Sequence, residues 1–161
     1  MEARAKILGH PIHQMLIPFP LGLLATSFFF DIAYYVFGNA QLAIVAFWMI
    51  LAGVIGGLAA AVFGLIDWLA IPAGTRAKAI GMWHGGGNVM VVALFIAGWF
   101  LRRPDPATPP IAAVVLSGVA VGLSLVTGWL GGELVDRLGV GVDDGAHLDA
   151  PSSLSGKPAR G

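Results

Sequence analysis

The sequence contains no cysteine among its 161 residues. Disulfides, thiol redox chemistry, iron–sulfur ligation and cysteine zinc sites are therefore excluded within this chain. Charged residues are scarce, at 11%, against about 25% in a typical soluble domain. Nine basic and nine acidic residues balance, and no basic block predicts a nucleic-acid partner. Motifs of serine hydrolases, nucleotide phosphate loops and dinucleotide folds are also missing, so the sequence gives no support for a conventional soluble-type active site.

Long apolar runs dominate what remains. Hydrophobic residues make up 57% of the chain, and a helix crosses a bilayer with about 20 apolar residues. The longest run is broken at Gly38-Asn39-Ala40-Gln41. Four membrane spans are therefore predicted, at about residues 16–37, 42–66, 82–101 and 111–130. They predict an all-α integral membrane four-helix bundle, up-down-up-down, forming one domain over residues 1–138. The Gly-, Asp- and Ser-rich residues 139–161 are predicted to be a disordered cytoplasmic tail.

Positive charges are divided unevenly between the two sides of the predicted bundle. Arg102 and Arg103 fall on one side. The side that holds both ends of the chain carries Arg4, Lys6, Arg76, Lys78, Arg137, Lys157 and Arg160. Short loops rich in Lys and Arg stay in the cytoplasm. The sequence therefore predicts a multi-pass protein with both termini cytoplasmic.

Polar side chains cluster where the predicted spans begin or end on that cytoplasmic side. His84 and Asn88 open the third span and share one helix face, being four residues apart. The other members of the cluster come from the remaining three spans: His10 and His13, Asp67 and Trp68, and Glu133. Since antiparallel threading brings these segments to one end of the bundle, we expect the side chains to share one layer.

This layer has three interpretations that the residues leave open. It is a structural polar cap that fixes helix ends, a b-type haem site, or a non-haem metal site. In the haem interpretation His84 is one axial ligand and His13 or His10 the other, with Trp68 near the ring. In the metal interpretation His10, His13 and His84, with Asp67 or Glu133, form a nitrogen and oxygen set suited to Zn, Fe, Cu or Mn. Proton or solute transport is a remaining alternative.

Two further features lie inside the predicted spans. Asp31 shares a helix face with Ser27 and a tyrosine, deeper toward the opposite side, and an acid there must pair or be protonated. It either holds helices together or serves a proton relay. Glycines spaced four residues apart, such as Gly53 and Gly57, favour close helix packing within the bundle, with a homo-oligomer seam as the alternative.

Several motifs together resemble a known family. The opening run from Gly9 to Pro20, GHPIHQMLIPFP, is followed by Asp31. The later motifs are Gly64-Leu65-Ile66-Asp67-Trp68-Leu69, His84 with Asn88, and Gly128-Trp129-Leu130-Gly131-Gly132-Glu133-Leu134-Val135. Over roughly residues 7 to 142 the chain resembles the bacterial membrane family labelled domain of unknown function 2231. Gln14 departs from the family pattern, where a second proline is expected, without disturbing either histidine.

The resemblance implies a four-helix protein of the bacterial inner (plasma) membrane, in a family without an established activity. Some members are joined to, or encoded beside, a Rieske-type iron–sulfur domain, which favours a redox role. The prediction is a small redox subunit in the lipid bilayer that binds haem b, or otherwise a transition metal, and transfers electrons. A Rieske-type protein or a quinone is the expected partner. The alternative is a non-catalytic scaffold or assembly subunit that binds no cofactor.

Overall fold

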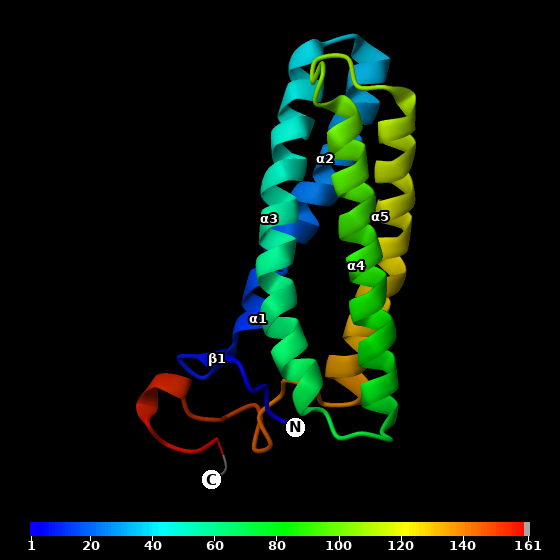
Figure 1. Cartoon of the computed structure of the whole chain (residues 1–161). Coiled ribbons are helices and arrows are strands. Elements are labelled where there is room, and N and C mark those ends of the chain that lie inside the picture. The colour runs from blue at the N-terminus through cyan, green and yellow to red at the C-terminus, as the bar shows by residue number, and fades with distance from the viewer. Residues whose placement is uncertain (160–161) are drawn as a thin grey trace.

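The computed structural model describes residues 1–159, so Arg160 of the charge count lies outside the described residues. Four long apolar helices form an antiparallel bundle (Figure 1). The candidate membrane spans are Ile12–Phe37, Ala40–Ala70, Arg76–Arg102 and Ile111–Arg137. The predicted fold class and the four spans are therefore confirmed. We call the end of the bundle near both termini the lower end and the opposite end the upper end (Figure 1).

The first hairpin consists of α1 (Ile12–Leu16), α2 (Pro18–Phe37) and α3 (Ala40–Ala70). Pro18 occupies the first position of α2, where a missing N–H costs little. Gly38 ends α2 with φ of 69°, a left-handed conformation that suits glycine. The Asn39 side chain then accepts a hydrogen bond from the Gln41 N–H and caps α3. The break predicted at residues 38–41 is thus a tight turn between antiparallel helices.

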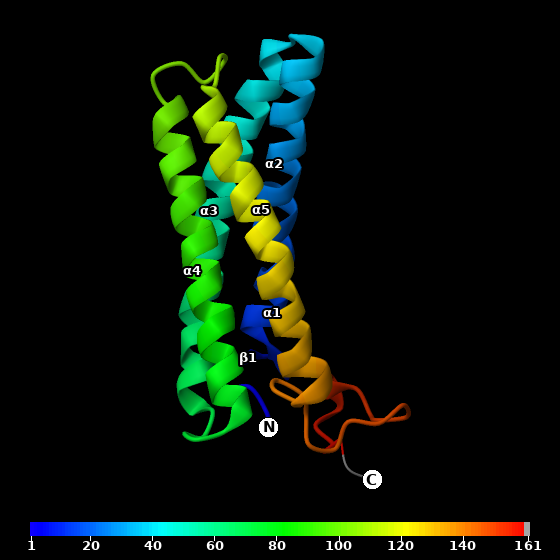
Figure 2. The ribbon, with the colours of Figure 1, turned by 90° about the vertical axis from the view of Figure 1, so that its right-hand side faces the viewer.

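The second hairpin consists of α4 (Arg76–Arg102) and α5 (Ile111–Gly132). Thr75 caps α4 by accepting from the Lys78 N–H at 3.2 Å, so this helix begins before the predicted start at residue 82. Pro110 precedes α5, and a π-helical turn over Glu133–Arg137 continues it. Both hairpins begin at the lower end, turn at the upper end and return (Figure 2).

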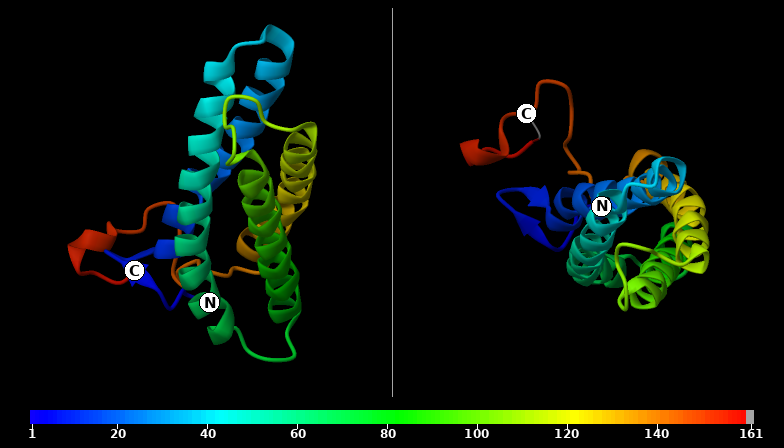
Figure 3. Two further views of the ribbon diagram at one scale, coloured as in Figure 1. Left: turned by 45° about the horizontal axis from the view of Figure 1, so that its top comes forward. Right: turned by 90° about the horizontal axis from the view of Figure 1, so that it is seen from above.

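The core lies where the hairpins meet, in the middle of the bundle. Packing is most extensive within each hairpin, between α2 and α3 and between α4 and α5. Seen from above, the four helices surround one shared interior (Figure 3). The buried cluster there is apolar and draws on all four long helices: Leu24, Ile50, Val54, Val91, Phe95 and Ala120. The chain therefore offers lipid an apolar exterior around a packed interior.

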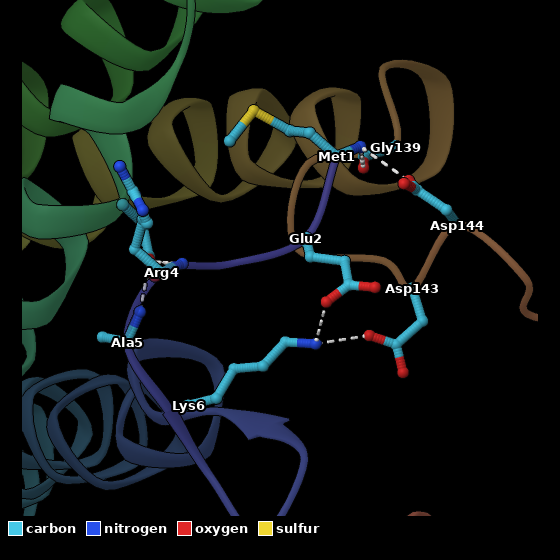
Figure 4. A network of polar contacts seen from close by, with 9 residues as sticks. Met1, Glu2, Arg4, Ala5, Lys6, Gly139, Asp143 and Asp144 are labelled. Atoms are coloured by element: carbon cyan, nitrogen blue, oxygen red, sulfur yellow. Dashed lines mark hydrogen bonds and ion pairs between the residues drawn. The ribbon is translucent and has the colours of Figure 1, made fainter. Parts of the chain in front are cut away.

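The segments before α1 and after α5 pack on each other at the lower end. Strands β1 (Lys6–Ile7) and β2 (His10–Pro11) form an antiparallel ladder with Ile7 opposite His10. Residues 139–159 consist of turns and a short 3-10 helix, Ser153–Ser155. Lys6 Nζ bonds Asp143 at 2.6 Å and Glu2 at 2.8 Å (Figure 4), and these bonds raise the pKa of Lys6 above its ordinary value. The predicted disorder of this tail in solution stays a prediction.

Candidate cofactor site at the lower end of the bundle

His13 lies in the short helix α1 and points across to α3. Its Nδ1 lies 2.8 Å from the Ala60 carbonyl oxygen. A carbonyl can only accept, so Nδ1 carries a proton, and Nε2 of the neutral ring keeps its lone pair. The ring packs on Gly64, where a Cβ would come within 2.9 Å of the ring atoms Cε1 and Nδ1. Glycine at this position therefore makes room for the imidazole.

His84 has the same arrangement in the second hairpin. Its Nδ1 lies 2.8 Å from the Thr127 carbonyl oxygen, so again the proton is on Nδ1. The ring packs on Gly131, where a Cβ would lie 3.1 Å from Cε1. The Asn88 amide nitrogen lies 3.3 Å from His84 Nε2 and donates to the His84 carbonyl oxygen at 2.9 Å. Thr127 Oγ1 in turn donates to Asn88 Oδ1 at 3.0 Å, which fixes the orientation of that amide.

The two imidazoles meet in the interior at the lower end. Their ring centroids are 6.4 Å apart and the ring planes cross at 87°, so the rings do not stack. Within residues 1–159, His13 Nε2 has no hydrogen-bond partner. The predicted convergence of His13, His84 and Asn88 is therefore found. Nδ1–H bonded to a backbone carbonyl is also the arrangement that orients histidine for metal ligation through Nε2.

The structure does not bring the remaining predicted site residues to this pair. His10 lies in β2, is exposed, and its Nε2 is 3.4 Å from Ser153 Oγ. Asp67 accepts the backbone N–H groups of Arg4 and Ala5 at 2.7 and 3.0 Å (Figure 4 shows this N-terminal segment). Glu133 pairs with Arg76.

Trp68 is likewise engaged locally. Its Nε1 donates to the Lys78 carbonyl, and the Lys78 ammonium lies 4.0 Å from the ring centroid. Among residues 1–159, no three His, Asp or Glu side chains gather closely enough to hold a metal ion. The five-residue metal set that the sequence pattern placed in one layer is therefore not assembled in this structure.

The sequence matches the family described as "Predicted membrane protein (DUF2231)" over residues 9–144. The chain belongs to the DUF2231 family. No curated protein and no solved structure matches it. The match to DUF2231 includes the whole bundle, so both histidines of the pair fall inside it.

The sequence predicted only one member of a buried ion pair in this DUF2231 protein. Asp31 and Arg102 form a two-pronged ion pair at the upper end, with N–O distances of 2.9 and 3.0 Å. Both side chains are 0% exposed, and Arg102 Nε also donates to the Gly98 carbonyl. Arg102 lies at the predicted end of the bundle, but it is the last residue of α4 and its side chain turns inward. The sequence signal for this pair was Asp31 itself, because a carboxylate inside a membrane span needs a partner.

Proposed function

We propose that this protein is a small redox subunit of the bacterial inner membrane that holds haem b between His13 and His84 and passes electrons between partners. The observation that carries the proposal is the spacing of the two imidazoles. An axial metal–nitrogen bond is about 2.0 Å, and a ring centroid lies roughly 1.1 Å beyond its nitrogen. Two imidazoles whose Nε2 atoms bind one metal atom from opposite sides have centroids about 6.2 Å apart, and a site of this kind is compatible with the observed separation of 6.4 Å.

The donor set favours haem over a bare ion. A zinc, iron or manganese ion held by protein alone needs four or more donors, whereas this pair offers two imidazole nitrogens and Asp67, Glu133 and His10 are engaged elsewhere. Of the candidate ions only copper(I) is satisfied by two imidazoles, and a metal assay distinguishes it from haem. A porphyrin brings four nitrogens of its own, so two axial imidazoles complete the iron. Bound haem would supply a reversible one-electron couple at this end of the bundle.

The surroundings support an axial role for both rings. Each Nδ1–H is fixed by a backbone carbonyl, which sets the tautomer with Nε2 free to ligate. Gly64 and Gly131 leave room for the imidazoles. Asn88 lies within hydrogen-bond distance of His84 Nε2 in the described structure and would be released from that contact when the nitrogen ligates.

The setting supports electron transfer within a larger assembly. The helices face lipid, and the chain carries no conventional catalytic motif, so the electron donor and acceptor belong to partners. A Rieske-type iron–sulfur protein gives or takes one electron per encounter, and a quinol gives two electrons and two protons in successive one-electron steps. Either matches a one-electron centre.

The charge distribution supports a cytoplasmic location for the site. With Arg102 turned inward, the upper connection between α4 and α5 keeps Arg103 as its basic residue. The segments at the lower end (Figure 1) carry Arg4, Lys6, Arg76, Lys78 and Arg137. Positive charge on one side of short loops favours that side as cytoplasmic.

An absorption spectrum tests the proposal. The protein is purified in mild detergent, spectra are recorded oxidised and reduced, and metals are assayed on the same sample. We expect reduced-minus-oxidised haem bands that vanish in His84→Ala and persist in the matched control His10→Ala, whose ring is exposed. Stoichiometric metal without haem bands would replace haem with an ion. Folded protein carrying neither would end the redox proposal and leave a scaffold or assembly role.

A further inference from the structure

We infer that the chain consists of two equivalent helical hairpins, and that a single ligand sits on the axis relating them, held equally by Nε2 of His13 and Nε2 of His84. The inference rests on the proposed function for the identity of the ligand. Parallel repeats related by an axis along the membrane normal occur in other membrane proteins, where binding sites lie at the repeat interface. The evidence for such a repeat here is positional, because the two halves share few residue identities.

The outgoing helices of the two hairpins bury matching positions. The buried residues of α2 are Pro20, Leu24, Ser27 and Asp31, and those of α4 are Val91, Phe95, Gly98 and Arg102. Each residue of the first set is 71 positions before its counterpart in the second, the separation that also joins Asp31 to Arg102. His13 and His84 obey the same relation (84 − 13 = 71).

The returning helices match in the same way. Every buried residue of α5 has a buried counterpart in α3 that is 67 positions earlier, as in Ala60 and Thr127 (127 − 60 = 67). The counterparts in α3 are Ala46, Phe47, Ile50, Gly53 and Ala60, and those in α5 are Ala113, Val114, Ser117, Ala120 and Thr127. Two helices often bury residues at the same spacing. Here both helices of one hairpin match those of the other, each pair with one constant difference in residue number, and this indicates that the whole hairpins pack equivalently.

The histidine contacts obey these offsets. His13 donates to Ala60 and packs on Gly64, whereas His84 donates to Thr127 and packs on Gly131. In both hairpins the accepting carbonyl lies four residues before the glycine. Ala60 and Thr127 are equivalent, and so are Gly64 and Gly131 (131 − 64 = 67). In each hairpin, the imidazole is therefore held by a carbonyl and a glycine at equivalent positions.

The contacts between hairpins are also related. Phe28 of the first hairpin packs on Gly118 of the second, where a Cβ would lie 3.0 Å from the ring. The equivalents of these residues are Trp99 and Leu51 (28 + 71, 118 − 67), and they line one small apolar cavity. Trp99 stacks on the first hairpin through Phe47, with centroids 5.0 Å apart. The hairpins thus dock on each other reciprocally, as an axis of approximate twofold symmetry requires.

Equivalence restricts what lies between the imidazoles. With both protons on Nδ1, each neutral ring presents one lone pair at Nε2; that of His84 lies 3.3 Å from the Asn88 amide nitrogen, and that of His13 has no partner among residues 1–159. A ligand on the axis must offer two equivalent acceptor positions on opposite sides, which a metal atom in a planar four-nitrogen ring does. His13 and His84 would both hold such a group through Nε2. With both imidazoles bound, the chemistry it would supply is outer-sphere electron transfer, without a place for oxygen or another small ligand.

Matched substitutions test the equivalence. His13→Gly and His84→Gly are compared by electron paramagnetic resonance and absorption, with and without added imidazole, and His10→Gly is the control. We expect the wild type to give a low-spin bis-imidazole signal and not to bind carbon monoxide when reduced. Both variants should lose that signal to the same extent and recover it with imidazole, while the control keeps it. His13→Met and His84→Met, which preserve side-chain volume, should raise the reduction potential by equal amounts if the glycine variants fold poorly.

The outcomes separate this inference from the proposed function. Haem that stays low-spin after one of the two substitutions, unequal shifts in the methionine pair, or carbon monoxide binding by the wild type would overturn the shared axial site while the redox function stands. Wild-type protein with neither haem nor metal would overturn both.

Discussion

The two ends of the bundle interior carry equivalent pairs of residues that are satisfied in opposite ways. At the upper end the equivalent positions hold Asp31 and Arg102, which neutralise each other directly and are both 0% exposed. At the lower end they remain identical, as His13 and His84, and each ring satisfies its Nδ1–H on its own hairpin. The upper pair is complete within the chain. The lower pair leaves two lone pairs that two neutral imidazoles cannot satisfy for each other.

The two pairs of side chains therefore have different roles in the symmetric interior. Buried charges of opposite sign across the axis join the hairpins and need no further partner. Two imidazole acceptors on either side of the same axis can instead hold a third group between them. The upper layer is therefore expected to respond to mutation through stability, and the lower layer through cofactor content.

The largest effect is expected from removing one charge of the upper pair. Arg102→Met leaves the Asp31 carboxylate buried without a partner, which costs about 3–5 kcal/mol. Adding Asp31→Asn should recover much of the loss, because no buried charge then remains. The measurement is denaturant unfolding in detergent as a double-mutant cycle. Arg103→Met is the matched control, since Arg103 is exposed. An equal loss of stability in both arginine variants would contradict a stabilising Asp31–Arg102 ion pair.

Exchanging the charges tests whether the two positions are equivalent. Asp31→Arg and Arg102→Asp alone each place two like charges in the interior and should prevent stable folding. The double exchange restores an ion pair across the same axis, so it should be more stable than either single variant by at least about 2 kcal/mol, a part of the cost of an unpaired buried charge. Thermal unfolding of the three variants checks this, and a double variant no better than the singles would argue against the repeat.

Smaller effects are expected from filling the space beside the lower pair. Gly64→Ala places a Cβ 2.9 Å from the His13 ring, which must shift away from the Ala60 carbonyl, at a cost of about 1–3 kcal/mol. Gly131→Ala should act on His84 in the same direction but more weakly, because its contact is 3.1 Å. Both variants should also lose cofactor. Gly128→Ala meets open space and should be neutral or stabilise by up to about 1 kcal/mol.

The smallest effect concerns the lower-end contacts outside the bundle. The pKa of Lys6 is raised by its bonds to Asp143 and Glu2, so this contact stabilises below the unfolded pKa of about 10.4 and is lost as pH rises through the folded value. The contribution should stay below about 1 kcal/mol because the carboxylates are exposed. Proteolysis near residue 143 should increase from pH 8 to pH 11 in the wild type. A Lys6→Met variant with the same pH response would remove Lys6 as the cause.

Much of the fold followed from the sequence because lipid imposes a simple rule. Apolar length alone predicted four spans, and the break at Gly38 and Asn39 is where the structure turns. Helix ends were less predictable. Thr75 and Lys78 cap and stabilise an earlier start of α4, a local interaction that hydropathy does not register.

The sequence predicted the layer of the bundle in which the site lies, but not the contacts that its residues make. Topology placed His13 and His84 in one layer, which the structure bears out with centroids 6.4 Å apart. It could not show that a tight β-turn, with Leu8 and Gly9 at positive φ, sets His10 in an exposed ladder. Nor could it show that Asp67 is taken by backbone N–H groups of the N-terminal segment.

The repeat was hidden for a physical reason. The two hairpins share the positions that face inward. The lipid-facing positions of the same helices are equally apolar, so hydropathy does not distinguish the inward face from the lipid face. Equivalent positions also differ in chemistry, as in Leu24 with Phe95 or Asp31 with Arg102. Residue identity therefore aligns poorly even where packing agrees.

Titration of cofactor-free protein with hemin measures whether His13 and His84 form one shared haem site. Protein in detergent is titrated while the Soret absorption is followed, beside a His13→Ala/His84→Ala double variant of matched helical content. We predict a single end point at one haem per chain in the wild type and none in the double variant. Two haems per chain, binding that the double variant retains, or folded wild type that takes up no haem would contradict a site shared by His13 and His84.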